Sequence, residues 1–261
     1  MLRILLVAVL ALYAGAAQAK PPVWIVKDKD SELVLFGSIH VLPAGLDWRP
    51  ARLDAALASA EDLWFEMPMD AAARAESGRL AMQRGVLPEG QTLSFLLSPD
   101  GAARLKRLTT AFGMSLEQLD RLKPWYAESV LAVAQYRRSG AELGTGVEQS
   151  LEAAAPPSAK RRAFEAPVDQ ISLLDATPLP RQIAALETSM RELEEKPKSF
   201  DRLVAAWMKG DVEAIARDAV GPFRENAPEI FAQLVDRRND AWTKTLHTRL
   251  KGKGRTVVVV G

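Results

Sequence analysis

The sequence predicts an α/β protein with a small mixed or parallel sheet built from N- and C-terminal strands. A large central helical region is expected at about residues 70–250. Three observations predict this class: apolar, β-branched runs near both ends of the chain, a strand–helix–strand succession after the first run, and periodic apolar residues with helix caps between them. The hydrophobic content of 48 % is ample for one core.

The first 19 residues have the form of a secretory signal peptide. Arg3 gives a positive start, an apolar run extends from Ile4 to Ala14, and Ala17–Ala19 supplies a small-x-small cleavage site. We therefore expect cleavage after Ala19, a single domain over residues 20–261, and a periplasmic or secreted location. An uncleaved anchor is the alternative, but the run is short beside the roughly 20 residues of a spanning helix. We expect no membrane span after cleavage.

Composition excludes several classes of function. The 34 basic residues balance 33 acidic ones, and no strongly basic stretch contains interleaved aromatic residues, which argues against a nucleic-acid partner. Cysteine is absent, so stability comes from a core rather than from disulfides, and thiolate nucleophiles and thiolate metal sites are ruled out. The chain has two histidines, His40 and His247.

The N-terminal strands place two of the chemically interesting residues. Residues 23–26 and 32–36 flank a polar turn and predict a β-hairpin. A helix is expected at about residues 50–60 and a further strand at 62–66. The strands of such a strand–helix–strand unit lie parallel and are usually adjacent. His40 and Glu66, at the ends of these strands, should therefore lie at the same edge of one sheet.

Helix-start signals organise the central region. Ser98 before Pro99 is typical of a capped helix start, and the spacing of Ser115 to Gln118 and of Thr145 to Glu148 fits a capping box. Further helices are expected to open at Pro124, to follow Asp211, and to run through residues 227–250.

Two more strands complete the predicted sheet. Residues 161–165 follow a Pro-Pro pair and can form one strand. Residues 256–260 form a β-branched run without alternating polarity, which predicts a strand buried in a parallel sheet. No covering helix follows this strand, so we expect the native reading frame to continue beyond Gly261.

The residues Phe36–Pro43, Trp64–Glu66 and Gly261 resemble the TraB/GumN family. That family includes the Tiki-type metalloproteases and is more distantly related to erythromycin-esterase and ChaN-like hydrolases. Its pattern has two Gly-x-x-His motifs at strand ends and an acidic residue after the second strand. Gly37 to His40 matches the first motif, Glu66 matches the acidic position, and Gly261 matches the first residue of the second motif.

The resemblance extends over almost the whole mature chain. Several other segments look like family positions: Gly146–Glu148, Phe164–Glu165 with Gln170, Trp207 with Gly210–Asp211, and Arg238–Asn239 with Trp242.

His40 and Glu66 together suit hydrolysis. Imidazole and carboxylate ligands without a thiolate favour Mn²⁺, Co²⁺ or Zn²⁺, and such a metal lowers the pKa of bound water to about 7. Alternatively, Glu66 is a general base toward water while His40 orients or shares the proton, without metal. The Tiki resemblance implies the metal route and peptide substrates, and the esterase resemblance implies the other.

Other residues are candidates with structural alternatives. Arg238 could be a catalytic anion or oxyanion partner, or a solvated helix residue. Glu66 could instead be salt-bridged, His40 could bond the backbone of its loop, and His247 fits a structural role at a helix end. Supporting roles are expected for Gly37, Glu148, Glu165, Asn239 and Gly261.

We therefore expect an exported metal-dependent hydrolase of Tiki-like type, acting on a peptide or small-molecule substrate. The alternatives are a non-catalytic peptide- or polysaccharide-binding or regulatory protein of the envelope, and a metal-independent, esterase-like hydrolase that uses Glu66 and His40.

Overall fold

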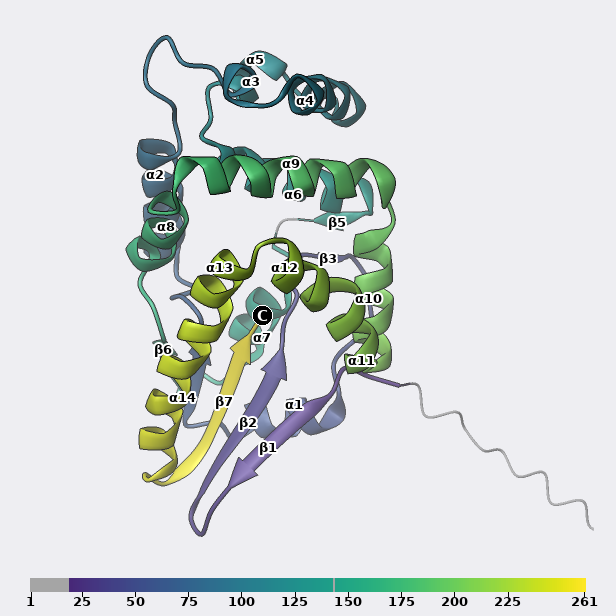
Figure 1. Cartoon of the computed structure of the whole chain (residues 1–261). Helices are drawn as coiled ribbons and strands as arrows, with labels where there is room; N and C mark the ends of the chain where they lie inside the picture. The colour runs from purple at the N-terminus through teal and green to yellow at the C-terminus, as the bar shows by residue number, and fades with distance from the viewer. Residues whose placement is uncertain (1–18, 143) are drawn as a thin grey trace, which may run out of the picture.

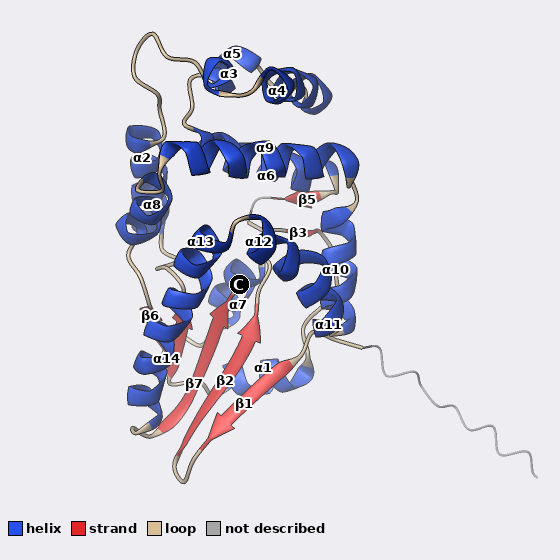
Figure 2. Cartoon of the chain, in the orientation of Figure 1, coloured by secondary structure: helices blue, strands red, loops and turns tan. Residues whose placement is uncertain are grey.

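A five-stranded mixed sheet forms the base of the molecule (Figures 1 and 2). The computed structural model describes residues 19–142 and 144–261, so nearly all of the expected signal peptide lies outside the described residues. The strand order is β1-β2-β7-β4-β6. The strands are β1 (Val23–Lys27), β2 (Ser31–Gly37), β4 (Asp62–Phe65), β6 (Lys160–Ala163) and β7 (Gly254–Val260).

The C-terminal strand β7 occupies the centre of this sheet. β1 pairs antiparallel with β2 as the predicted hairpin, and the other neighbours are parallel. The expectation that β2 and β4 are adjacent is wrong, because β7 lies between them. Val257, Val258 and Val259 are at most 1 % exposed and bring no polar side chain to either face, so their burial requires a central position. The parallel direction still brings the ends of β2 and β4 to one edge.

Helices cover both faces of the sheet. α1 (Ala51–Ala58) lies behind it and buries Leu53 and Leu57, while α14 (Arg237–Leu250) crosses in front (Figure 2). Beside α1, Phe36 of β2 stacks on Trp48 at 5.7 Å between ring centroids, and Trp207 of α10 (Ser199–Lys209) meets both rings. This aromatic cluster anchors the strand that leads to His40.

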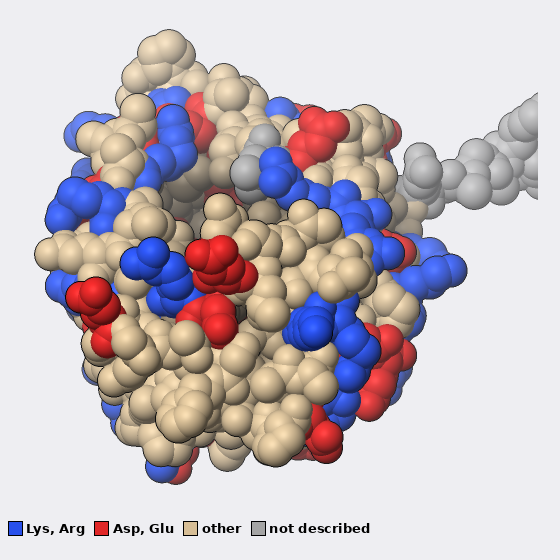
Figure 3. Space-filling view, turned by 90° about the horizontal axis from the view of Figure 1, so that it is seen from above, with Lys and Arg blue, Asp and Glu red and all other residues tan. Residues whose placement is uncertain are grey.

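The predicted helical region stands above the carboxyl ends of the strands (Figure 1), and Figure 3 views the molecule from this side. It has its own core, in which Leu105, Leu131 and Leu186 are fully buried. Its helices are α2 (Ala71–Arg84), α3 (Leu93–Leu96), α4 (Pro99–Phe112), α5 (Leu116–Asp120), α6 (Pro124–Arg138), α8 (Pro167–Asp175) and α9 (Leu179–Glu195). The short strands β3 (Leu42–Pro43) and β5 (Ala141–Glu142) pair antiparallel. Together with α7 (Val147–Ala154) they pack into the core of the sheet.

Most of the expected helix starts are present. Ser98 accepts a hydrogen bond from the Gly101 amide, Ser115 accepts one from the Gln118 amide, and Pro124 is the first residue of α6. The prediction of a capping box from Thr145 to Glu148 is wrong. The Thr145 hydroxyl donates to the carbonyl oxygens of Leu42 and Glu142 instead, and the residue before α7 is Gly146, which has no side chain to cap the helix. The Glu148 side chain is therefore free for another role.

The last helical stretch is less regular than predicted. Asp211 caps α11 (Val212–Ile215) as expected, and a π turn η1 (Ala216–Val220) and α12 (Gly221–Asn226) follow. The long helix begins at Pro228 as α13 (Pro228–Phe231) and passes through a second π turn, η2 (Ala232–Asp236), into α14. Within the described ranges, none of the helices has the length and apolarity needed to span a bilayer.

Candidate active site

The candidate site lies at the carboxyl ends of the four parallel strands. His40 follows β2 by three residues, Glu66 follows β4 directly, Glu165 follows β6 by two residues, and Gly261 follows β7 directly. Backbone hydrogen bonds continue the pairing of β4 and β6 beyond the strands, since the Glu165 amide donates to the Glu66 carbonyl oxygen at 2.9 Å. Ligand sites in parallel α/β sheets are typically formed at this edge.

A buried carboxylate holds the His40 imidazole. Nδ1 of His40 lies 2.6 Å from Oε1 of Glu148, and the Ser38 hydroxyl donates to the same oxygen at 2.6 Å. The Glu148 side chain is 7 % exposed, whereas that of His40 is 69 % exposed. When Nδ1 carries the proton, it donates to Glu148 and Nε2 keeps its lone pair for a ligand or a proton.

The contact between His40 and Glu148 shifts the pKa of both side chains. The hydrogen bond with Glu148 raises the pKa of His40 above its usual value, with the nearby charge of Glu148 adding to it. Burial opposes ionisation of Glu148, but the hydrogen bonds with His40 and Ser38 outweigh it, so the pKa of Glu148 is lowered. Glu148 is therefore a buried carboxylate that stays ionised, and Oε2 has no hydrogen-bond partner among the described residues.

The start of α7 delivers Glu148 to His40. The Val147 amide donates to the Ile39 carbonyl oxygen at 3.1 Å, which brings the helix N-terminus against the loop after β2. Gly146 approaches so closely that a Cβ atom there would clash with the carbonyl oxygen of His40. The glycine is required by this approach, and its φ is not positive.

His40 and Glu66 face a common point at the end of β7. Oε1 of Glu66 accepts a hydrogen bond from the Gly261 amide at 2.8 Å. A Cβ atom built on Gly261 would lie 3.3 Å from Oε1 of Glu66 and 3.5 Å from Nε2 of His40. One small group placed there would therefore touch both side chains.

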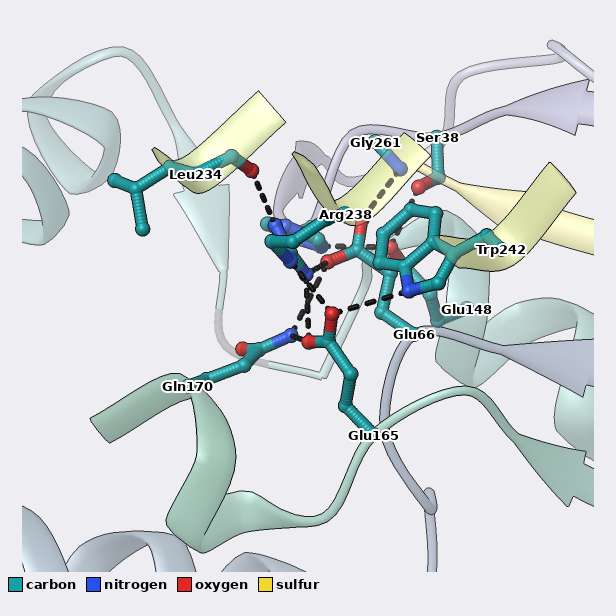
Figure 4. A network of polar contacts seen from close by, with 10 residues as sticks. Ser38, Glu66, Glu148, Glu165, Gln170, Leu234, Arg238, Trp242 and Gly261 are labelled. Atoms are coloured by element: carbon teal, nitrogen blue, oxygen red, sulfur yellow. Dashed lines mark hydrogen bonds and ion pairs between the residues drawn. The ribbon is translucent and has the colours of Figure 1, made fainter. Parts of the chain in front are cut away.

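Arg238 binds two carboxylates at once (Figure 4). Nη2 lies 2.7 Å from Glu66 and 3.0 Å from Glu165, and Nε lies 2.8 Å from Glu165. Burial disfavours the charged guanidinium, but the two carboxylates outweigh that effect and raise the pKa of Arg238. The Arg238 side chain is 17 % exposed, which is incompatible with a solvated helix residue.

Two further side chains complete the network around Glu165. The Trp242 indole donates to Glu165 at 3.0 Å, and its ring lies under the Arg238 guanidinium at 4.5 Å. The Gln170 amide donates to Glu165 at 2.9 Å and to Glu66 at 3.3 Å. In Figure 4 these side chains converge from α14, from α8 and from the segment after β6.

The π turn η2 positions Arg238. It ends one residue before α14 begins at Arg237, and Nη1 of Arg238 donates to the Leu234 carbonyl oxygen within this turn at 2.9 Å. π turns inside helices recur at functional sites, where the widened turn redirects a side chain.

The structure brings most of the expected site residues together. His40 and Glu148 form one hydrogen-bonded pair. A second network joins Glu66, Glu165, Arg238 and Gly261, and the two groups face each other at Gly261. Gly37 lies behind it, where its carbonyl oxygen accepts a 2.9 Å hydrogen bond from the Trp207 indole. Asn239 is exposed on α14, and His247 is exposed in the last turn of that helix.

Ser38 was not anticipated. Its position inside the Gly37–His40 motif was the available signal, because a hydroxyl two residues before the histidine lies on the same side of an extended segment. For Gln170 and Trp242 the available signal is the resemblance of their positions to the family.

Two of the described side chains suit a divalent metal. Nε2 of His40 and Oε1 of Glu66 face the same point, and a carboxylate on the other imidazole nitrogen is the usual support of a metal-binding histidine. In the part of the chain that the structure describes, no group of three or more His, Asp or Glu side chains is arranged to hold a metal ion. His40 and Glu66 thus fit as part of a ligand set.

The fold and the site define a class of protein: a mixed α/β chain with His, Glu and Arg side chains gathered at the carboxyl ends of its parallel strands. A family model of the TraB/PrgY/gumN family matches residues 22–261. The chain belongs to this family, which confirms the resemblance seen in its motifs. Comparisons with curated proteins and with solved structures each found no significant match.

Proposed function

We propose that this protein is a hydrolase of metallopeptidase type. The observation that carries the proposal is the His40 imidazole, with Nδ1 held by buried Glu148 and Nε2 facing the same point as Glu66. A nitrogen and an oxygen donor that converge in this way, without thiolates, suit Mn²⁺, Co²⁺ or Zn²⁺. Such an ion would supply a water of lowered pKa and polarise a substrate carbonyl.

Each residue of the network has a distinct part in the proposal. Glu148 fixes the tautomer and the orientation of His40, and Ser38 holds Glu148. Glu66 offers Oε1 toward the common point while Oε2 is bound by Arg238. The Arg238 guanidinium donates hydrogen bonds to Glu66, Glu165 and the Leu234 carbonyl oxygen. We therefore assign it a positioning role rather than that of an oxyanion partner.

A metal-independent hydrolase is the second candidate, and one observation favours it. Both oxygens of Glu66 already accept hydrogen bonds, whereas the His40 side chain is mostly exposed and, among the described residues, its ring is hydrogen-bonded through Nδ1 alone. In that mechanism His40, oriented by Glu148, is the general base toward water. The substrate is then an ester as readily as a peptide.

Export is proposed from the sequence of the first 19 residues. Sequencing the N-terminus of the protein from producing cells tests it: we expect the mature protein to begin at Lys20 and to be recovered outside the cytoplasm. An N-terminus at Met1 in a cytoplasmic fraction contradicts export.

Chelation separates the two hydrolytic mechanisms. The complete gene product is incubated with a pool of fluorogenic peptides, before and after 1,10-phenanthroline or EDTA treatment, and with Mn²⁺, Co²⁺ or Zn²⁺ returned. We expect hydrolysis that chelation abolishes and one of the metals restores. Hydrolysis that chelation leaves unchanged supports the metal-independent mechanism. Absence of hydrolysis with peptide or polysaccharide binding retained contradicts both and leaves a binding protein.

A further inference from the structure

A cavity lies apart from the His40 site. Its volume is about 440 Å³, and its walls are formed by α6, α9, α10 and the segment from α11 to α12. In Figure 1, α6 and α9 belong to the upper helical layer, α12 lies below them, and α10 and α11 lie at the right. None of His40, Glu66, Glu148, Glu165 and Arg238 lines it.

The cavity is large and mostly apolar. Leu131, Leu186, Phe200 and Leu203 are among its lining residues. Protein cores contain few voids larger than a water molecule, whereas small-molecule sites occupy about 300–1,000 Å³. The space is partly open to solvent, and its volume is within the range of small-molecule sites.

One carboxylate in the wall has no cationic partner. Glu128 of α6 accepts a hydrogen bond from the Ser189 hydroxyl of α9. Within the described ranges, no Lys, Arg or His nitrogen forms an ion pair with it. Burial raises the pKa of Glu128, as expected for a carboxyl withdrawn from water without a compensating charge. The geometry thus presents an acidic group at an apolar wall.

The other charged residues that line the cavity are exposed or paired. Lys196, Arg202 and Asp218 are all exposed. Lys196 lies 3.6 Å from Glu192, and Asp218 pairs with Arg217 at 2.8 Å. The charge that a buried ligand group would meet is therefore that of Glu128, which favours a cation over an anion.

The wall formed by η1 and α12 has an irregular backbone. Pro222 cannot donate a backbone hydrogen bond, and its ring would crowd the carbonyl four residues earlier in a regular helix. The preceding turn is widened, so that the Gly221 amide donates to the Ala216 carbonyl oxygen, five residues back. Ala219, Pro222 and Phe223 of this segment line the cavity, and Phe223 is 37 % exposed. Widened turns of this kind recur where helices form ligand sites.

We propose that this cavity binds a small amphiphilic amine, with its apolar body against the leucine and phenylalanine walls and its ammonium group on the Glu128 carboxylate. Apolar burial supplies most of the affinity of such a ligand, and the ion pair selects for a cation because an unpaired carboxylate in an apolar wall is costly. The site is independent of the hydrolase proposal.

Three matched probes test the charge preference. Isothermal titration of the purified protein uses 4-phenylbutylamine, 4-phenylbutan-1-ol and 4-phenylbutanoate, which share one apolar body. We expect the amine to bind at least about tenfold more tightly than the alcohol, equivalent to about 1.4 kcal/mol, and the carboxylate to bind most weakly. The proposal is overturned if the unsubstituted protein binds the three probes with equal affinity or prefers the carboxylate.

Variants locate the binding. Glu128→Gln keeps the shape and should raise the Kd of the amine about tenfold while leaving that of the alcohol unchanged. Glu195→Gln, at the exposed end of α9 and outside the cavity lining, is the matched control and should change neither. Ala219→Trp fills part of the cavity and should weaken both probes. Unchanged amine binding in Glu128→Gln or in Ala219→Trp refutes the assignment, and thermal unfolding confirms that each variant is folded.

Discussion

Nδ1 of His40 lies 2.6 Å from Oε1 of Glu148, although the two residues are 108 positions apart in the chain. The contact joins the end of β2 to the start of α7, and it determines which nitrogen of the imidazole faces the strand ends. The hydrogen bond with this carboxylate is the largest influence on the pKa of His40, and together with the charge of Glu148 it outweighs burial, which favours the neutral imidazole.

The first prediction concerns the pKa of His40. Because Glu148 stabilises the imidazolium, we expect this pKa to lie above the ordinary value of about 6.5. Glu148→Gln removes the charge and should lower it. NMR titration of the two imidazoles measures both, with exposed His247 as internal control. A His40 pKa unaffected by Glu148→Gln contradicts the contact.

The raised pKa of His40 predicts how both stability and activity change with pH. A raised folded-state pKa means that the His40–Glu148 contact stabilises the fold fully below pH 6.5 and loses that contribution as the pH rises through the folded-state pKa. Hydrolysis needs a lone pair on Nε2, so its rate should rise over the same interval. A rate that falls there would show that the imidazolium is the active form.

A second prediction concerns the Arg238 network. Arg238, Glu66 and Glu165 have side chains between 12 % and 17 % exposed, so removing the guanidinium leaves two carboxylates poorly solvated and close together. Arg238→Ala should lower the free energy of unfolding by about 3–5 kcal/mol in urea titrations. Arg237→Ala, its exposed neighbour, should change it by less than about 0.5 kcal/mol. Equal effects would argue against the network.

A third prediction concerns an ion cluster at the opposite end of β4. Asp62 is 8 % exposed and lies 2.5 Å from Nε of Arg162 and 2.9 Å from Nε of Arg249. Burial opposes its ionisation, but the two guanidinium groups outweigh it, and the pKa of Asp62 is lowered. Its stabilising contribution is therefore complete above the unfolded-state pKa of about 3.9 and is lost as the pH falls through the lower folded-state value.

Asp62→Asn tests this contribution. Its free energy of unfolding should fall below that of the unsubstituted protein by about 2–4 kcal/mol between pH 5 and 7. The difference should shrink as the pH drops below 3.9. A difference that is constant over the whole pH range would mean that the loss reflects packing rather than charge.

A fourth prediction tests the approach of α7 to the loop after β2. Gly146→Ala introduces a methyl group against the His40 carbonyl oxygen, so it should displace α7, lower the pKa of His40 and destabilise the fold by about 1–3 kcal/mol. Gly78→Ala is the matched control in α2, where a Cβ atom meets nothing within 4 Å. It should stabilise by about 0.5–1 kcal/mol. Similar behaviour of the two variants would contradict the close approach.

The sequence was sufficient to place His40 and Glu66 at one sheet edge. Apolar runs that end in polar residues, with a helix between them, constrain the direction of β2 and β4 strongly. They do not constrain which distant strand inserts between them, and the position of β7 became evident only from its pairing with both strands.

Glu148 and Ser38 illustrate a second limit. The spacing of Thr145 and Glu148 fits a capping box, and no local signal distinguishes that role from a contact with a loop a hundred residues earlier. Glu148 contacts His40 because Gly146 lets α7 approach the loop after β2 closely, and this approach is a feature of the tertiary structure. Arg238 is similar, because its burial follows from two carboxylates on other strands rather than from the pattern of its own helix.

The central claim is that His40 is the functional centre of the site. The most direct test measures the initial rate of peptide hydrolysis by the complete gene product and by its His40→Ala and His247→Ala variants, at equal protein concentration and with the restoring metal present. We predict that His40→Ala lowers the rate at least about 100-fold, within the range typical of a lost acid–base group, while His247→Ala leaves it unchanged. Equal rates for the two variants would contradict the claim.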